Sequence, residues 1–114
     1  MKFERELLKG VAPVVVLQIL SRGKMYGYEL SDALEQRSEG ILTLGRGTLY
    51  PLLYNLEAKG LVAAEWDENE SKRKRRYYSI TSKGKGELAA KREQWMSLQQ
   101  GVSLVFGLGR LSPA

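Results

Sequence analysis

The residues with the strongest chemical character are five consecutive cations, Lys72-Arg73-Lys74-Arg75-Arg76. Lysine and arginine side chains bind phosphate groups, and each such contact releases counterions from a nucleic acid, so that affinity falls steeply as salt rises. The whole chain is also basic, with a formal net charge of +5. The run therefore favours a polyanionic partner, either nucleic acid or an anionic membrane surface. A solvated charge run balanced by Asp67, Glu68 and Glu70 is the alternative interpretation.

The residue types that are missing exclude several kinds of chemistry. The chain has no cysteine and no histidine, which excludes thiolate nucleophiles, imidazole bases, disulfides and the usual zinc sites. Its carboxylates are dispersed and form no paired arrangement. The stretch Gly45-Arg46-Gly47-Thr48 lacks the spacing of a nucleotide-binding loop. We therefore predict a protein that is not an enzyme and holds no metal or cofactor.

The chain has 114 residues, of which 43% are hydrophobic and 27% are charged. This length and composition suit one globular domain with a modest core. The longest apolar stretch, Val11 to Leu20, is interrupted by Pro13 and is shorter than the roughly 18 to 20 residues that span a bilayer. The first residues also lack the layout of a secretory signal. We therefore expect a cytoplasmic protein with no membrane partner.

Two helices are predicted in the first third of the chain. From Leu7 to Leu20 the apolar residues follow helical spacing, and Pro13 either lies in the first turn of this helix or kinks a longer one. A second, amphipathic helix is predicted from about Tyr26 to Arg37. Gly40 marks the loop that follows it.

A third helix is predicted from about Thr48 to Lys59. The leucines at positions 49, 52, 53 and 56 have the i, i+3, i+4, i+7 spacing of an amphipathic helix. Thr48 can cap the start of the helix, Pro51 is tolerable in its first turn, and Gly60 supplies a stop. Burial of the leucines turns the remaining side chains of this helix outward.

After the third predicted helix, apolar residues occur at every second position. Leu61 to Trp66 and Arg75 to Ile80 are predicted strands around a polar turn. The pair forms a hairpin, or wing, with the cationic run at its tip. Trp66 is predicted to be a structural residue under this hairpin.

A last helix opens at Thr81 or Ser82. Its apolar residues recur at steps of seven, three, four and three, as in the seam between paired helices. We therefore predict that this helix dimerises the protein. The predicted dimerisation residues are Leu88, Trp95, Leu98, Val102, Val105 and Phe106.

Together these elements predict a mainly α (α+β) fold, a winged helix-turn-helix with a C-terminal dimerisation helix. Residues 1–80 are expected to form the winged-helix DNA-binding domain, residues 81–107 the dimerisation helix and residues 108–114 a flexible tail. In this architecture the third helix is the recognition helix, which enters the major groove of duplex DNA.

The predicted DNA contacts come from the third helix, the start of the second helix and the wing. Hydroxyl, amide and guanidinium groups at these places can reach phosphates or base edges. Tyr50 and Tyr54 can instead pack on neighbouring helices with only their hydroxyls exposed. The full set is Lys24, Tyr26, Arg46, Thr48, Tyr50, Tyr54, Asn55, Lys72, Arg73, Lys74, Arg75 and Arg76.

Four segments carry a family resemblance. Tyr26–Leu30 opens the second helix and Gly47–Leu53 opens the third, while Leu56–Val62 leads into the wing and Arg75–Gly84 leads out of it. In these motifs the chain resembles the PadR-like family of transcriptional regulators, over roughly residues 7–106.

The single helix after the wing makes the chain similar to the short-tailed, multidrug-responsive repressors of that family. This resemblance implies a homodimer on double-stranded operator DNA, released when a planar hydrophobic molecule binds. It also implies that Trp95 stacks on that molecule in a pore at the dimer interface, although an aromatic residue at seam spacing equally fits a filled interface core. The other pore residues that the resemblance implies are Gly10, Val14, Leu17, Met96 and Gln99.

Two further functions fit the same residues. The chain could be a winged-helix module that binds another protein or RNA, with its wing as an electrostatic patch. Alternatively, ligand capture could be the main activity, with weak DNA binding. Tight, sequence-specific binding to duplex DNA separates a regulator from the first alternative. If ligand capture is the main activity, mutating Arg73 and Arg76 should leave ligand affinity and biological output unchanged.

Overall fold

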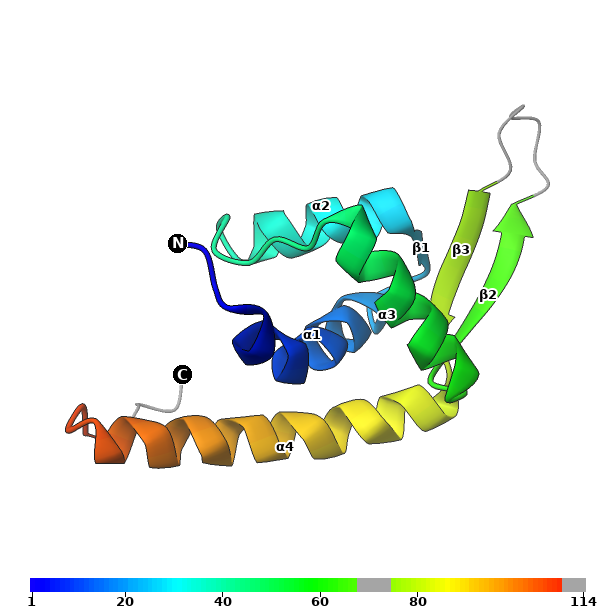
Figure 1. The fold of residues 1–114 in the computed structure, drawn as a ribbon. Helices are drawn as coiled ribbons and strands as arrows, with labels where there is room; N and C mark the ends of the chain where they lie inside the picture. The colour runs from blue at the N-terminus through cyan, green and yellow to red at the C-terminus, as the bar shows by residue number, and fades with distance from the viewer. Residues whose placement is uncertain (68–74, 110–114) are drawn as a thin grey trace.

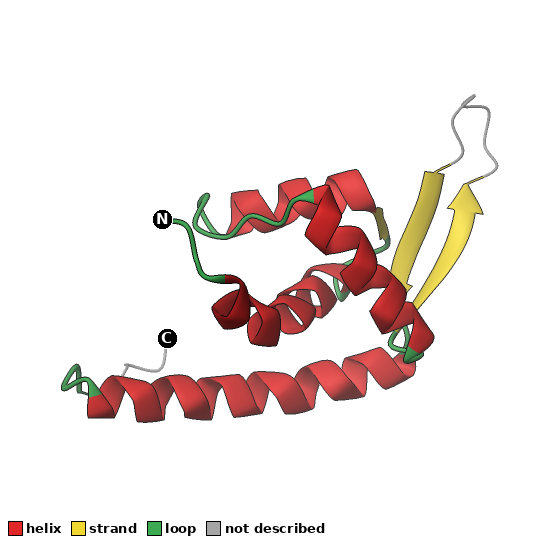
Figure 2. Cartoon of the chain, viewed as in Figure 1, coloured by secondary structure: helices red, strands yellow, loops and turns green. Residues whose placement is uncertain are grey.

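The computed structural model describes residues 1–67 and 75–109. Its elements follow the order of a winged helix-turn-helix with a further helix after the hairpin (Figure 1). Helices form most of the described chain, and the hairpin strands lie together at one end (Figure 2). The mainly α, winged-helix fold predicted from the sequence is confirmed. The elements are α1 (Arg5–Leu20), β1 (Met25–Tyr26), α2 (Gly27–Arg37), α3 (Arg46–Ala58), β2 (Val62–Asp67), β3 (Arg75–Ile80) and α4 (Ser82–Val105).

The hydrophobic core is built around α1, which packs against α2, α4 and β3. Burying a large apolar side chain stabilises the fold by about 1.5–3 kcal/mol, so the most deeply buried residues dominate the packing energy. They come from α1, α2, α3 and β3. The largest fully buried side chains are Tyr78, Leu17, Leu20, Leu30, Leu49, Leu53 and Val16.

Helix α1 begins at Arg5 and continues to Leu20. Pro13 therefore lies in the helix interior and does not start the helix. A proline there removes one backbone hydrogen bond, the one to the carbonyl four residues earlier. Ala12 and Val14 on either side of it are buried in the core, and this tertiary packing stabilises the helix in spite of the missing bond.

Helix α2 begins at Gly27, because Tyr26 belongs to the short strand β1. Tyr26 pairs with Tyr77 of β3, and β3 also pairs with β2, so the antiparallel sheet has the order β1-β3-β2. The carboxylate of Glu29 accepts a hydrogen bond from the backbone N–H of Tyr26 at 3.3 Å. Strand β1 is not predictable from the sequence, because a strand of two residues has no apolar spacing of its own.

Helix α3 begins at Arg46, two residues earlier than predicted, and Gly45 is its N-cap. Thr48 therefore lies in the first turn and does not cap the helix, and Pro51 lies further inside than expected. Gly60 has a φ of 75°, the left-handed conformation that ends many helices. The predicted stop after α3 is confirmed.

A tight corner joins the end of α3 to the start of α4. The Oγ1 atom of Thr81 accepts a hydrogen bond from the backbone N–H of Gly84 at 3.0 Å and donates one to the carbonyl of Gly60 at 2.7 Å. The ammonium group of Lys83 donates to the carbonyl of Lys59 at 2.8 Å. These bonds satisfy backbone groups that the two helix ends would otherwise leave unpaired.

The same corner leaves no space for a side chain at Gly84. This residue is buried in the first turn of α4. A Cβ atom at Gly84 would overlap the backbone carbonyl of Leu61 and the side chain of Ile80. The approach of α4 to the root of the wing therefore depends on glycine at this position.

Helix α4 has 24 residues and extends past the other elements, giving the molecule a longest dimension of 55 Å (Figure 1). Its first half is tied to the core through Leu88, which is buried, and through Arg92, which donates to the side-chain oxygen of Gln18 at 3.1 Å. Within the described ranges, no helix combines the length and apolarity needed to cross a bilayer. Of the predicted tail, residues 110–114 lie outside the described residues.

Candidate nucleic-acid interface

The outward face of α3 is polar and exposed. The leucines of this helix at positions 49, 53 and 56 are buried in the core, whereas Arg46, Thr48, Tyr54 and Asn55 are exposed. Tyr54 has 52% of its surface accessible. Guanidinium, hydroxyl and amide groups on one helix face can contact both phosphates and base edges in a major groove. This arrangement is the one expected of a recognition helix.

Tyr50 is half-buried and packs against the first residue of α2. Its ring lies so close to Gly27 that a Cβ atom on Gly27 would collide with the Tyr50 phenol. The rings of Tyr50 and Tyr54 are 6.3 Å apart. The packing interpretation therefore applies to Tyr50, while Tyr54 keeps its ring exposed.

An aromatic cluster surrounds the start of α2. Tyr26 is half-buried; its ring stacks on Tyr28 at 6.5 Å and meets the ring of Tyr77 edge-on at 5.6 Å. The guanidinium carbon of Arg75 lies 4.8 Å from the centroid of the Tyr26 ring. Tyr26 therefore connects α2 to the wing and holds the exposed Arg75 beside it.

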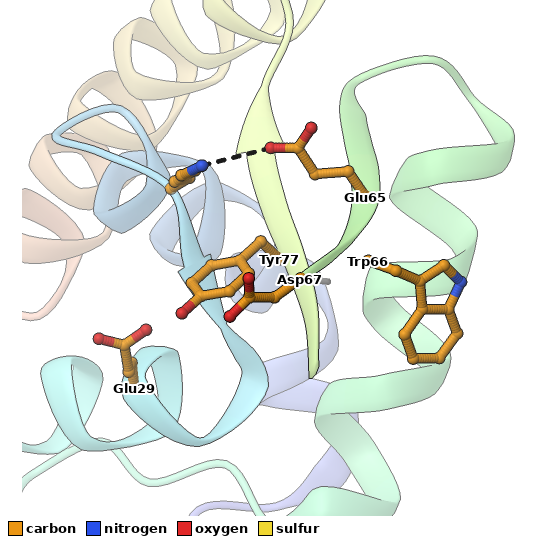
Figure 3. Close-up of a pocket in the computed structure, with 6 residues that line it drawn as sticks. Glu29, Glu65, Trp66, Asp67 and Tyr77 are labelled. Carbon is orange, nitrogen blue, oxygen red and sulfur yellow. Dashed lines mark hydrogen bonds and ion pairs between the residues drawn. The ribbon is translucent and has the colours of Figure 1, made fainter. Parts of the chain in front are cut away.

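One face of the hairpin is acidic (Figure 3). Glu65, Asp67 and Tyr77 line a pocket of about 460 Å³ there, and Glu29 of α2 adds a third carboxylate. Lys24 forms an ion pair with Glu65 at 3.3 Å, and both side chains are largely exposed, so the pair adds little stability. Lys24, a predicted DNA contact, thus lies on a face whose carboxylates repel phosphate.

The other face of the hairpin points toward α3. Trp66, Arg76 and Tyr78 alternate along the strands with the residues of the acidic face. With Tyr50 and Tyr54 they line a groove of about 260 Å³ between α3 and the wing. Trp66 is 57% exposed, so the prediction of a structural residue under the hairpin is wrong.

Arg76 forms an ion pair with Glu57 of α3, with 2.8 Å between Nη2 and Oε2. Burial lowers the pKa of the Arg76 guanidinium, but the interactions with Tyr78 and Glu57 outweigh burial and raise the pKa overall. Glu57 is not recognisable as a site residue from the sequence, because 19 positions separate it from Arg76 and no spacing pattern relates them. The remaining wing cations, Lys72, Arg73 and Lys74, lie outside the described residues.

Tyr78 gives the stability of this region a pH dependence. Burial raises the pKa of its phenol above the usual value of 10.0, and Arg76 offsets part of the rise. The folded protein therefore holds the phenolic proton more tightly than the unfolded chain. Stability that is present below about pH 10 is lost as the pH rises toward the folded-state pKa. Denaturant titrations should show this alkaline loss reduced in Tyr78→Phe and unchanged in the exposed control Tyr28→Phe. Equal losses in all three proteins would contradict the assignment to Tyr78.

The predicted dimerisation residues divide into two groups. Leu88 is buried in the core of the described chain, so it holds α4 against its own winged-helix domain and does not lie on an exposed seam. The others are exposed on α4 or directly after it. They are Trp95, Leu98, Val102, Val105 and Phe106.

The predicted ligand-binding residues divide in the same way. Gly10, Trp95 and Met96 are exposed and Gln99 is half-buried. Val14 and Leu17 are buried within the chain, Leu17 with only 1% of its surface accessible. These two side chains form part of the core and do not line a surface of the described chain, because the apolar stripe of α1 faces inward.

Comparison with known proteins identifies relatives along most of the chain. The model of the Transcriptional regulator PadR-like family matches residues 16–90. A transcriptional regulator from Clostridium thermocellum has a similar structure, with a TM-score of 0.80 and 28% identity over 89% of this chain and 97% of that one. A PadR family transcriptional regulator from Eggerthella lenta has a TM-score of 0.75 and 36% identity over 89% of this chain and 82% of that one.

A curated relative is longer than this chain. The transcriptional regulator YqjI of Escherichia coli is 31% identical over 93 residues, which cover 82% of this chain and 43% of that protein. The chain belongs to the PadR-like family, and it is a DNA-binding transcriptional regulator.

Proposed function

We propose that the chain acts as a homodimeric repressor whose operator binding is relieved by a planar hydrophobic molecule. The observation that carries this proposal is the pairing of two surfaces on one small domain. The polar outward face of α3 suits duplex DNA, and an exposed apolar row on α4 suits a second copy of the chain.

The dimer follows from the exposed residues of α4. Trp95, Leu98, Val102 and Val105 recur at steps of three, four and three and are accessible to water. A contiguous exposed apolar surface marks an interaction site more often than chance. Since most soluble oligomers are symmetric homodimers, the partner that this row fits best is α4 of a second copy.

The dimer determines the form of the operator. Two recognition helices related by a twofold axis read an inverted repeat, with half-sites roughly one turn, about 10 bp, apart. Arg46, Tyr54 and Asn55 are the proposed contacts in each half-site, and Arg75, the first residue of β3, is a proposed phosphate contact on the wing. The acidic pocket on the opposite hairpin face turns away from DNA, which limits repulsion.

The effector site is proposed at Trp95. Its exposed indole lies on the α4 row, and two copies facing one another across the dimer axis could hold a flat aromatic molecule between them. Met96 and Gln99 are neighbours on the same helix. Release of the operator then requires that the molecule prefer the dimer conformation that does not bind DNA.

The test is a binding titration on a labelled duplex from the region upstream of the protein's own gene. Binding that persists in excess nonspecific competitor and falls with salt at a slope of roughly −0.9 per phosphate contact is expected. A planar aromatic dye should weaken this binding in the wild type and have no effect in Trp95→Leu. Binding erased by competitor would favour a nonspecific or protein-binding module. A dye that binds without changing DNA affinity would remove the effector part of the proposal.

A further inference from the structure

The geometry points to Arg76 as a positioning residue that joins the wing to the recognition helix through Glu57, and not as a phosphate contact. This inference rests on the proposed operator binding, but its test includes a measurement made without DNA. In this arrangement Glu57 holds Arg76 in place, and Arg76 differs in role from the other wing cations.

Arg76 contacts three elements at once. Its Nη2 atom lies 2.8 Å from Oε2 of Glu57 on α3. Its guanidinium carbon lies 5.9 Å from the ring centroid of Trp66 on β2 and 5.7 Å from that of Tyr78 on β3. Distances below about 6 Å allow a cation–π attraction. One side chain therefore links the recognition helix to both strands of the wing.

The positive charge of Arg76 is already paired with the carboxylate of Glu57 inside the protein. The Arg76 and Glu57 side chains are 31% and 32% exposed, so about two thirds of each is removed from water. The Nε atom of Arg76 is buried and has no hydrogen-bond partner among the described residues. Moving the guanidinium to a phosphate would break the pair and leave the Glu57 carboxylate, without its partner, close to the DNA. Such an exchange gains little, because one charge-assisted bond replaces another.

Arg75, the neighbouring cation, lies in a different environment. It is exposed and rests over the Tyr26 ring, at the edge of the same groove that Arg76 lines, and its guanidinium is not paired with Glu57. From there it can move toward DNA without breaking the link between α3 and the wing. The two adjacent arginines therefore have different roles, with Arg75 as the contact and Arg76 as the link.

A fixed angle between wing and recognition helix matters for sequence recognition. Phosphate contacts fix the position of a protein on the duplex, and base contacts then specify the sequence. If the link is lost, the wing and α3 no longer fit the same half-site together. Operator affinity should then fall, while the number of phosphate contacts, and so the salt dependence, stays the same.

The decisive variant is Glu57→Gln, with Glu65→Gln as its matched control. Each removes one carboxylate that is paired to a cation, Glu57 from α3 and Glu65 from the acidic face of the hairpin. The probe is a duplex that the wild type selects from a randomised library, and a scrambled duplex reports nonspecific affinity. We expect Glu57→Gln to weaken binding to the selected duplex by about tenfold at an unchanged salt slope, with no loss on the scrambled duplex. Glu65→Gln should bind both duplexes as tightly as the wild type or more tightly.

A phosphate contact by Arg76 would give the opposite results. If Arg76 is a phosphate contact, Glu57→Gln frees it and tightens binding, and Arg76→Met lowers the salt slope by about 0.9. Either outcome overturns the inference. A loss of stability alone would not change the ratio of selected to scrambled affinity at a temperature where each variant is fully folded.

If the wild type selects no sequence from the library, the proposed operator binding is contradicted, but the link between Arg76 and Glu57 is not. A measurement without DNA tests that link. The indole N–H signal of Trp66 in a ¹H–¹⁵N spectrum, assigned by its loss in Trp66→Phe, reports the contact with Arg76. Glu57→Gln and Arg76→Met should shift this signal and speed amide exchange in β2 and β3, whereas Glu65→Gln should leave the indole signal in place. An unchanged indole signal and unchanged exchange in Glu57→Gln would rule out the link.

Discussion

Replacing Gly84 with alanine is expected to prevent stable folding of the winged helix. The added methyl group would overlap the backbone carbonyl of Leu61 and the side chain of Ile80. A backbone carbonyl cannot rotate away as a flexible side chain can, so α4 would have to separate from the root of the wing. That separation breaks the bonds of Thr81 to Gly60 and exposes Leu88. The expected cost is about 4 kcal/mol or more, a large part of the about 5–15 kcal/mol by which small domains are stable.

Thermal unfolding followed by circular dichroism measures this effect, and Gly86→Ala is the matched control. Gly86 lies two residues further along α4, and a Cβ atom there meets nothing within 4 Å. Since alanine is a better helix former than glycine, Gly86→Ala should raise stability by about 1 kcal/mol. Similar melting of the two variants would show that the corner is looser than described.

The second large effect is expected at the α4 row. Leu98→Asp places a charge in the middle of the proposed dimer seam, where burial without a partner is costly. The protein should become monomeric in analytical ultracentrifugation while its circular dichroism spectrum stays that of a folded chain, because Leu98 is exposed in the described structure. Operator affinity should fall by about 10²–10⁴-fold, since two linked half-site contacts become independent.

Ser97→Asp provides the control for this experiment. Ser97 is exposed next to Leu98 but lies off the row formed by Trp95, Leu98, Val102 and Val105. The same charge at this position should leave the dimer and its operator affinity close to wild type. A Leu98→Asp protein that remains dimeric would mean that the chains associate through another surface.

The sequence predicts the helices and the hairpin well where a single spacing pattern extends over many residues. The leucine stripe of α3 and the alternation in β3 are such patterns, and both elements appear within two residues of their predicted ends. The start of α3 was misplaced because Gly45 caps it without a side-chain hydrogen bond, whereas Thr48 has the residue type of a cap. The backbone conformation places the N-cap at Gly45, and the residue types of Gly45 and Thr48 do not reveal that conformation.

The division between core and interface could not be predicted from spacing alone. Leu88 and Leu98 both fit the seam of α4, and Leu17 fits the inner stripe of α1. Periodicity says that one face of a helix is apolar, but it does not say whether that face meets the same chain or another. Leu88 and Leu17 are buried within the chain and Leu98 is exposed, and only the packing of α4 on α1 separates them.

The corner between α3 and α4 also makes one long helix a lever arm. At one end of α4, Lys83 and Thr81 hold the carbonyls of Lys59 and Gly60, directly after the recognition helix. The apolar row, which begins at Trp95, lies in the second half of this helix of 24 residues, which is about 36 Å long at about 1.5 Å per residue. In the proposed dimer, where the two rows would cross, a tilt of about 5° would displace the corner ends of the helices, roughly 25 Å from the crossing, by about 2 Å. This displacement is more than half the rise of one base pair, about 3.4 Å, so a slight change in the crossing angle of the proposed dimer would move its two recognition helices out of register with the grooves.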